Sequence, residues 1–116
     1  MQIEVKGRNV SVTDDFREHV RRRFTKVDKQ VSEFARLEIE ISHERNPSNP
    51  EAEVVEATLY LKGATLRAHD AARDFNRALN MCEEELSRQV KRHRDKRRRR
   101  REARAASPRS GIQPAL

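Results

Sequence analysis

Residues Asp70–Arg101 read DAARDFNRALNMCEEELSRQVKRHRDKRRRRR, and this stretch decides the fold of the chain. Its apolar residues recur at steps of three and four, so they fall on one face of a helix. Asp70 is the predicted N-cap of this helix, with Ala71 and Ala72 as good helix formers behind it. The pattern predicts a helix that packs on a core through Ala71, Phe75, Leu79, Cys82, Leu86 and Val90.

The second half of the same stretch has no apolar face. After Val90 the helix-compatible residues continue, but basic side chains project all around the axis. They are Lys91, Arg92, Arg94, Lys96 and the run Arg97–Arg101. A helix that is polar on every side cannot pack on a core. We therefore expect this half to project from the domain or to lie on a polyanionic partner.

The charge of the chain is divided unevenly along its length. The 116 residues have a formal net charge of +7. Residues 1–85 contain 14 Lys and Arg against 17 Asp and Glu, whereas residues 86–116 contain 12 against 2. Such asymmetry is typical of binding to nucleic acid or to an anionic membrane surface. A membrane-binding helix needs bulky apolar residues among its basic ones. Lys91–Ala103 has none, which favours nucleic acid.

Alternating apolar residues predict four strands. In the first segment, for example, Ile3 and Val5 share one face and polar residues take the other. The last three segments are separated by the predicted loop Asn46–Pro50 and by a turn at Gly63, so we expect an antiparallel meander. The four predicted strands are Gln2–Arg8, Arg36–Glu44, Glu53–Lys62 and Ala64–His69.

A second helix is predicted between the first two strands. Thr13 is the expected N-cap, and the apolar stripe consists of Phe16, Val20, Phe24, Val27 and Val31. We interpret the opposite face as a solvated surface or as a contact for nucleic acid; it carries Arg17, Arg21, Arg22, Lys26 and Lys29. The order is β-α-β-β-β-α. The predicted fold class is α+β, with both helices packed on one face of a four-stranded sheet.

Four short segments occur in an order that is found in a known family. They are I-x-V-K-G-R-N-V-x-V-T at Ile3–Thr13, L-x-I-E-I-S at Leu37–Ser42, A-T-L-R-A-H-D-A-A at Ala64–Ala72 and E-L-S-R-Q-V-K-R-H-R-D-K at Glu85–Lys96. Together they resemble the ribosome hibernation-promoting factors, a family that includes the bacterial ribosome-associated inhibitor. The fold of that family looks like a double-stranded-RNA-binding domain.

The resemblance implies a protein that binds the small ribosomal subunit, in the channel where messenger RNA and the A- and P-site tRNAs bind. There it would contact 16S rRNA and inhibit translation in starved or stationary cells. By position, the rRNA-binding residues of the family carry over to Arg88, Gln89, Lys91, Arg92, Lys96, Lys6, Arg8 and Arg67. The chain departs from the family near Glu85, where a lysine is common, because it has the acidic run Glu83–Glu85.

On this basis we divide the chain into a ribosome-binding α+β domain, residues 1–96, and a basic tail, residues 97–116. After Arg101 the sequence has few apolar residues and two prolines, so we expect the tail to be disordered. Aromatic residues are scarce, and Tyr60 is the one that falls on the polar face of a strand. We therefore expect contacts from a rigid helix to folded rRNA rather than base stacking to dominate.

The sequence contains no recognisable catalytic arrangement. The histidines at 19, 43, 69 and 93 are scattered, and no carboxylates form an acid–base pair in an apolar setting. We expect no catalytic residues, no metal site, no cofactor and no small-molecule substrate. Cys82 is interpreted as a small buried hydrophobe in a reduced intracellular setting.

The expected location is the cytoplasm, because the N-terminus lacks a signal-peptide pattern and no run could span a membrane. We expect a monomer when the protein is free. Two other non-enzymatic functions stay open at this point. One is a generic basic RNA-binding or structural ribosomal protein, and the other is an interaction module that pairs through a sheet edge.

Overall fold

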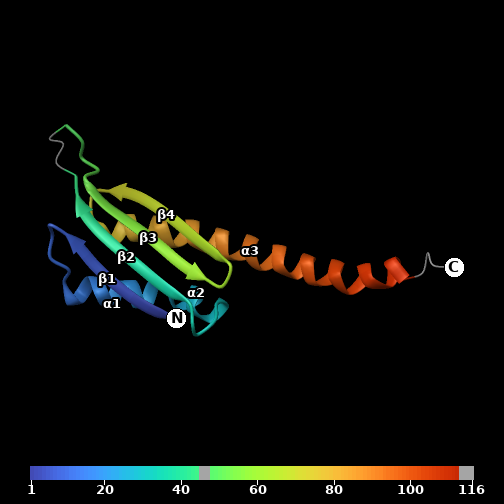
Figure 1. The fold of residues 1–116 in the computed structure, drawn as a ribbon. Helices are drawn as coiled ribbons and strands as arrows, with labels where there is room; N and C mark the ends of the chain where they lie inside the picture. Colours follow the sequence, from blue (N-terminus) through green and yellow to red (C-terminus); the bar gives the residue numbers. More distant parts are fainter. Residues whose placement is uncertain (45–47, 113–116) are drawn as a thin grey trace.

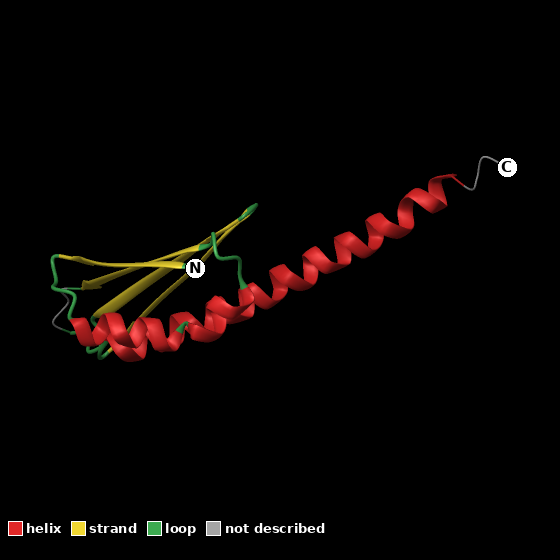
Figure 2. Ribbon diagram, turned by 90° about the horizontal axis from the view of Figure 1, so that it is seen from below, coloured by secondary structure: helices red, strands yellow, loops and turns green. Residues whose placement is uncertain are grey.

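The computed structural model describes residues 1–44 and 48–112, with side chains described up to residue 105. Residues 46 and 47 of the predicted loop and 113–116 of the predicted tail lie outside the described residues. The elements are β1 (Gln2–Arg8), α1 (Asp14–Arg23), α2 (Thr25–Gln30), β2 (Arg36–His43), β3 (Glu53–Leu61), β4 (Ala64–Ala72) and α3 (Phe75–Ile112). A four-stranded sheet carries the helices on one face, which confirms the predicted α+β class (Figures 1 and 2).

The strands lie side by side in chain order, β1-β2-β3-β4. β1 is parallel to β2, and the other two pairs are antiparallel, so the predicted meander is confirmed. One row of paired residues, Val5, Ile39, Ala57 and Ala68, crosses all four strands. All four side chains are buried, which shows that the alternation in the sequence aims one face of every strand at the same core.

The core lies between this face and the helices. The predicted stripe of α3 is confirmed from Phe75 on: Leu79, Cys82, Leu86 and Val90 are fully buried, and Phe75 is partly buried against the same core. α1 and α2 contribute Phe16, Val20, Phe24 and Val27 to the same cluster. The Phe16 and Phe75 rings meet edge to face with centroids 6.0 Å apart, which joins α1 to the start of α3.

The predicted start of α3 is wrong by four residues. Asp70, Ala71 and Ala72 belong to β4, where Ala71 and Ala72 pair with Val54 and Glu53 of β3. The alanines favour a helix only weakly, and the strand pairing together with burial of Ala72 outweighs that preference. Asp74 is the actual capping residue, since its Oδ1 accepts a hydrogen bond of 2.7 Å from the backbone N–H of Arg77.

The helix predicted for residues 13–31 is divided in two at Phe24. Thr13 caps it as predicted, with Oγ1 accepting a 3.1 Å hydrogen bond from the N–H of Phe16. At the division, Thr25 Oγ1 donates a hydrogen bond of 3.1 Å to the carbonyl oxygen of Arg21. Bonds of this kind compete with the helix backbone and bend helices. Phe24 nevertheless stays fully buried between the two segments.

Helix α3 extends well past the core. It has 38 residues, and its backbone is helical through residues 97–112, where a disordered tail was predicted. The last fully buried residue is Val90, and the helix beyond it projects from the sheet (Figure 2). The molecule is therefore elongated, with principal extents of 72 × 29 × 19 Å. The expectation of a projecting basic half is confirmed.

Replacing Leu86 by Ala should lower the free energy of unfolding by about 2–5 kcal/mol, because a fully buried side chain leaves a cavity. Arg94→Ala is the matched control on the same helix, since Arg94 is exposed, and it should change stability by less than about 0.5 kcal/mol. Urea unfolding of both variants measures the difference. Equal losses would contradict the assigned core face of α3.

Candidate nucleic-acid interface

Helix α3 fixes the direction of most of the predicted RNA-binding side chains. Arg88, Gln89, Lys91 and Arg92 lie within two residues of Val90, which is locked in the core. Because the helix cannot rotate about its axis without exposing Leu86 and Val90, these side chains keep fixed directions. Lys96 lies farther along the same helix and is exposed. The core thus holds a row of cations in place before any ligand binds.

A groove between α2 and α3, which we call the cationic groove, collects basic residues from both helices. Arg88 and Lys91 of the predicted set line it. Its other basic residues come from α2 and from farther along α3, and they belong to the basic stretches noted in the sequence but not to the eight predicted rRNA-binding residues: Lys26, Arg94, Arg97, Arg98 and Arg101. Among the described residues that line it, Asp95 is the one acidic residue, and its Oδ1 lies 3.7 Å from Arg98 Nη2. Such a surplus of cations suits a phosphate backbone.

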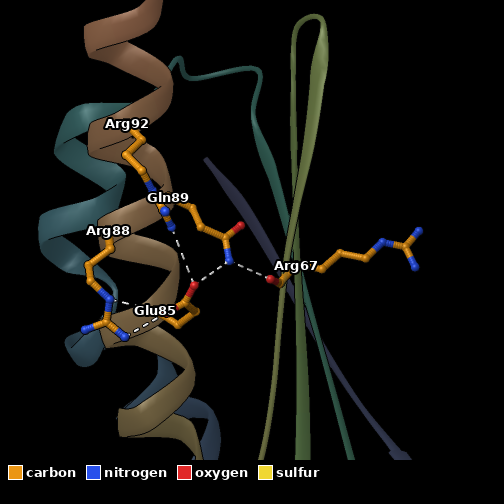
Figure 3. A network of polar contacts seen from close by, with 5 residues as sticks. All are labelled: Arg67, Glu85, Arg88, Gln89 and Arg92. Atoms are coloured by element: carbon orange, nitrogen blue, oxygen red, sulfur yellow. Dashed lines mark hydrogen bonds and ion pairs between the residues drawn. The ribbon is translucent and has the colours of Figure 1, made fainter.

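Glu85 offsets the charge of neighbouring cations on α3, including Arg88 of the cationic groove (Figure 3). Glu85 accepts a hydrogen bond of 2.7 Å from Arg88 Nη2 and one of 3.1 Å from Gln89 Nε2. Arg92 Nη2 lies 3.7 Å from the same carboxylate. The hydrogen bond from Arg88 lowers the pKa of Glu85 below its ordinary value, and Glu85 raises the pKa of Arg88. Glu85 and Arg88 therefore stabilise each other's charged form.

Gln89 has a structural partner as well. Its Nε2 donates a 2.8 Å hydrogen bond to the backbone carbonyl of Arg67, which ties α3 to β4. The Arg67 side chain itself points away from the helix (Figure 3). Gln89 and Arg67 are thus close in the fold, but they present their side chains to different surfaces.

Lys6 and Arg8 lie on β1, at the opposite edge of the sheet from Arg67. Lys6 Nζ is 2.7 Å from Glu38 and 3.8 Å from Glu40, and Arg8 Nε is 4.0 Å from Glu40. The hydrogen bond between Lys6 and Glu38 raises the pKa of the lysine and lowers that of the glutamate. The eight predicted residues therefore do not form one surface. Arg88 and Lys91 meet in the cationic groove, whereas the three sheet residues lie apart from it.

Three of the residues considered for catalysis or metal binding, Cys82, His19 and His43, make contacts within the fold. Cys82 is fully buried, its Sγ donates to the carbonyl of Val55, and burial raises its pKa to about 12. His19 contacts Asn80 Oδ1 at 3.0 Å, and His43 contacts Glu53 Oε1 at 2.6 Å. In the part of the chain that the structure describes, no three His, Cys, Asp or Glu residues come together to hold a metal ion. No helix of the same part is long and apolar enough to cross a membrane.

Comparison with known proteins places the chain in a family. The model of the family described as "Sigma 54 modulation protein / S30EA ribosomal protein" matches residues 3–98. The chain belongs to this family. The matched range covers the whole sheet, α1, α2 and the packed half of α3, which are the elements that position the cationic groove.

Relatives in this family are named for ribosome hibernation. The chain is 28% identical over 99 residues to the ribosome hibernation promoting factor of Acinetobacter guillouiae, covering 81% of this chain and 88% of that protein. It is 31% identical over 97 residues to the ribosome hibernation promotion factor of Lactococcus lactis, covering 80% of this chain and 49% of that protein. It thus matches most of one relative and about half of another. The resemblance seen in the sequence motifs is confirmed.

A solved structure supports the same fold. The N-terminal domain of Protein Y from Thermus thermophilus superposes with a TM-score of 0.67 at 23% identity, covering 80% of this chain and 99% of that domain. At this level of identity the likeness concerns the arrangement of strands and helices. It agrees with the element order described above.

The acidic run Glu83–Glu85, where the family resemblance leads us to expect a lysine, is neutralised within the protein. Glu83 and Glu84 lie 2.9 Å and 3.4 Å from the Arg23 guanidinium, which joins α3 to α1. Glu85 neutralises Arg88 and Arg92 instead. Glu85 therefore reduces the positive potential that this part of the helix presents to solvent.

Replacing Glu85 by Gln should raise the affinity for RNA several-fold and steepen its dependence on salt by about one charge, because Arg88 and Arg92 lose their internal counterion. Glu4→Gln, an equal charge change on an exposed β1 residue, is the control and should have a smaller effect. Fluorescence anisotropy with a short RNA duplex at several salt concentrations measures both. Weaker binding by Glu85→Gln would mean that Glu85 positions the arginines rather than masks them.

Proposed function

We propose that this chain is a ribosome hibernation factor. In this proposal it binds 16S rRNA in the messenger and tRNA channel of the small subunit, at the A and P sites, and inhibits translation under starvation or in stationary phase. The support comes from membership of the family, from relatives that are named for hibernation, and from the cationic groove. The protein acts by occupying a site and not by catalysing a reaction, and its place of action is the ribosome in the cytoplasm.

The cationic groove is the observation that carries the proposal. Arg88 and Lys91 of α3 and Lys26 of α2 line it, so basic side chains from two helices converge on the same groove. Arginine and lysine neutralise phosphates and release their counterions, which gives an affinity that depends on salt and hardly on sequence. Folded rRNA offers closely spaced phosphates in a fixed arrangement. A rigid row of cations loses little entropy when it binds such a surface.

The two parts of the chain have different tasks in this proposal. Residues 1–96 set the position on the subunit, because the core fixes the direction of their cations. Residues 97–116 extend the groove through Arg97, Arg98 and Arg101 and add further basic charge, which raises affinity and encounter rate. Gln89, Arg92, Lys96, Lys6, Arg8 and Arg67 remain proposed rRNA contacts on the surfaces that flank the groove.

A structural ribosomal protein is the second candidate, since the family description itself includes a ribosomal protein. The two functions differ in when the protein is bound. A structural component is present on growing ribosomes in equal stoichiometry, whereas a hibernation factor is present on idle ribosomes. Sucrose-gradient fractions from growing and starved cells, probed for this protein, distinguish the two.

Addition of the purified protein to a translation extract should lower initiation, and excess messenger RNA with initiator tRNA should relieve the inhibition. Competition is expected because the protein and these ligands would occupy the same channel. Filter binding of both ligands to small subunits gives the direct measurement. Inhibition that leaves the subunit able to bind both ligands at full affinity would refute the blocking mechanism.

Replacing Arg88 and Lys91 by Glu should abolish protection of the decoding-centre rRNA, because both line the cationic groove. Arg99 and Arg100 do not line this groove, so their replacement by Glu is a matched double charge reversal on the same helix. That variant should bind more weakly and with a smaller salt slope but keep the same footprint. Chemical probing of the rRNA at two salt concentrations measures the footprint and the salt dependence of each variant. If the Arg99 and Arg100 replacement moves the footprint and the Arg88 and Lys91 replacement does not, the residues outside the groove set the position and the proposal is wrong.

A further inference from the structure

A second groove opens where α3 leaves the sheet, and its lining is of a different kind. We call it the aromatic groove. It has a volume of about 760 Å³, within the range of pockets that bind small molecules. Its apolar part includes Val31, Phe34, Tyr60 and Val90. Its basic part consists of Arg36, Lys62, Arg94 and Arg97, and no described residue that lines it carries a carboxylate.

Phe34 is the most unusual side chain of this groove. It lies in the connection between α2 and β2 and is 88% exposed, whereas Phe16 and Phe24 are buried in the core. A hydrogen bond of 3.1 Å from its backbone N–H to Ser32 Oγ holds the local turn. An exposed aromatic ring on a held turn offers a flat face to solvent. Base stacking uses such a face.

Tyr60 supplies a second flat surface. The Arg36 guanidinium lies over its ring, 4.4 Å from the centroid, and Arg36 Nη1 is 3.9 Å from Glu38. The stacked pair is planar and positively charged, and a guanidinium plane is itself a surface on which bases stack. The groove wall also includes His93, whose buried Nε2 has no hydrogen-bonding partner among the described residues. Buried polar atoms without partners are rare, and a ligand can supply one.

The two grooves are adjacent and share part of their lining. Gln30, Arg94 and Arg97 line both of them. A chain that follows the cationic groove with its phosphates therefore passes the entrance of the aromatic groove. There, Arg94 and Arg97 can hold a phosphate on the border while the attached base turns inward.

We propose that the aromatic groove binds one unpaired RNA nucleotide, with the base against Phe34 and its phosphate on Arg94 and Arg97. The proposal rests on the RNA-binding function above and adds a recognition element to it. Four basic residues and no carboxylate favour a phosphate-bearing ligand over an apolar peptide. Because every base has a stackable face, the groove selects an unpaired nucleotide rather than a particular sequence. It lets the protein distinguish a bulge or loop from a plain duplex.

The test uses the 116-residue chain and two RNA hairpins with the same stem, one with a single bulged 2-aminopurine and one fully paired. The wild-type protein should bind the bulged hairpin roughly tenfold more tightly, as expected for stacking of one base, and should quench the 2-aminopurine fluorescence. Phe34→Ala should lose both the preference and the quenching but keep the affinity and salt dependence seen with the paired hairpin. Met81→Ala is the control, because Met81 is 41% exposed on α3 and does not line the groove.

Three outcomes would overturn the proposal. The first is that the wild-type protein shows no preference for the bulged hairpin or binds neither hairpin. The second is that Phe34→Ala behaves like the wild-type protein in every assay. The third is that Phe34→Ala weakens binding to purified small subunits but leaves hairpin binding unchanged, which would assign the groove to a protein partner. Failure of the hibernation function itself would appear separately, as loss of small-subunit binding by the wild-type protein while its preference for the bulged hairpin remains.

Discussion

Burial of one stripe of α3 against the inner face of the sheet is the interaction on which the rest of the structure depends. Leu79, Leu86 and Val90 are fully buried there, and Gln89 adds a hydrogen bond to the backbone of β4. This packing fixes the rotation of the helix about its axis. The same constraint therefore stabilises the domain and decides which basic residues of α3 face α2 and which face β4. Core and interface cannot vary independently on such a helix.

The sequence predicts the elements well where the signal is local. The alternation in the four strands, the cap at Thr13 and the buried stripe from Phe75 to Val90 all appear as expected. The start of α3 was missed because residues 70–74 read as a capped, alanine-rich helix start, while pairing with β3 holds the first three in a strand. That pairing involves residues far apart in the chain, and no local pattern reports it.

The candidate site can also be predicted only where the signal is local. That α3 carries the basic residues follows from composition and periodicity alone. The two grooves cannot be predicted in this way, because residues that are distant in the chain line them. Lys26 and Arg88 line one groove only after the helices have packed, and Phe34 lines the other together with Tyr60 and Val90. The ion pairs of Glu85 were not predictable either, although the acidic run was a visible departure from the family. The sequence did indicate Lys26, because it lies on the basic face of the helix predicted at residues 13–31. That face was interpreted as a solvated surface or a nucleic-acid contact, and Lys26 now lines the cationic groove together with residues of α3.

The projecting half of α3 has a consequence for where the helix ends. Like charges recur there at a spacing of four, as in Arg94 with Arg98 and Arg97 with Arg101, and each such pair disfavours the helix slightly. The packed half removes the cost of nucleation, so the free half needs only to propagate. Added salt or a bound polyanion screens the repulsion and favours each further turn. We therefore expect the helical length of this protein to vary with its ionic surroundings, and far-ultraviolet circular dichroism would record this as a gradual change without a melting transition of the domain.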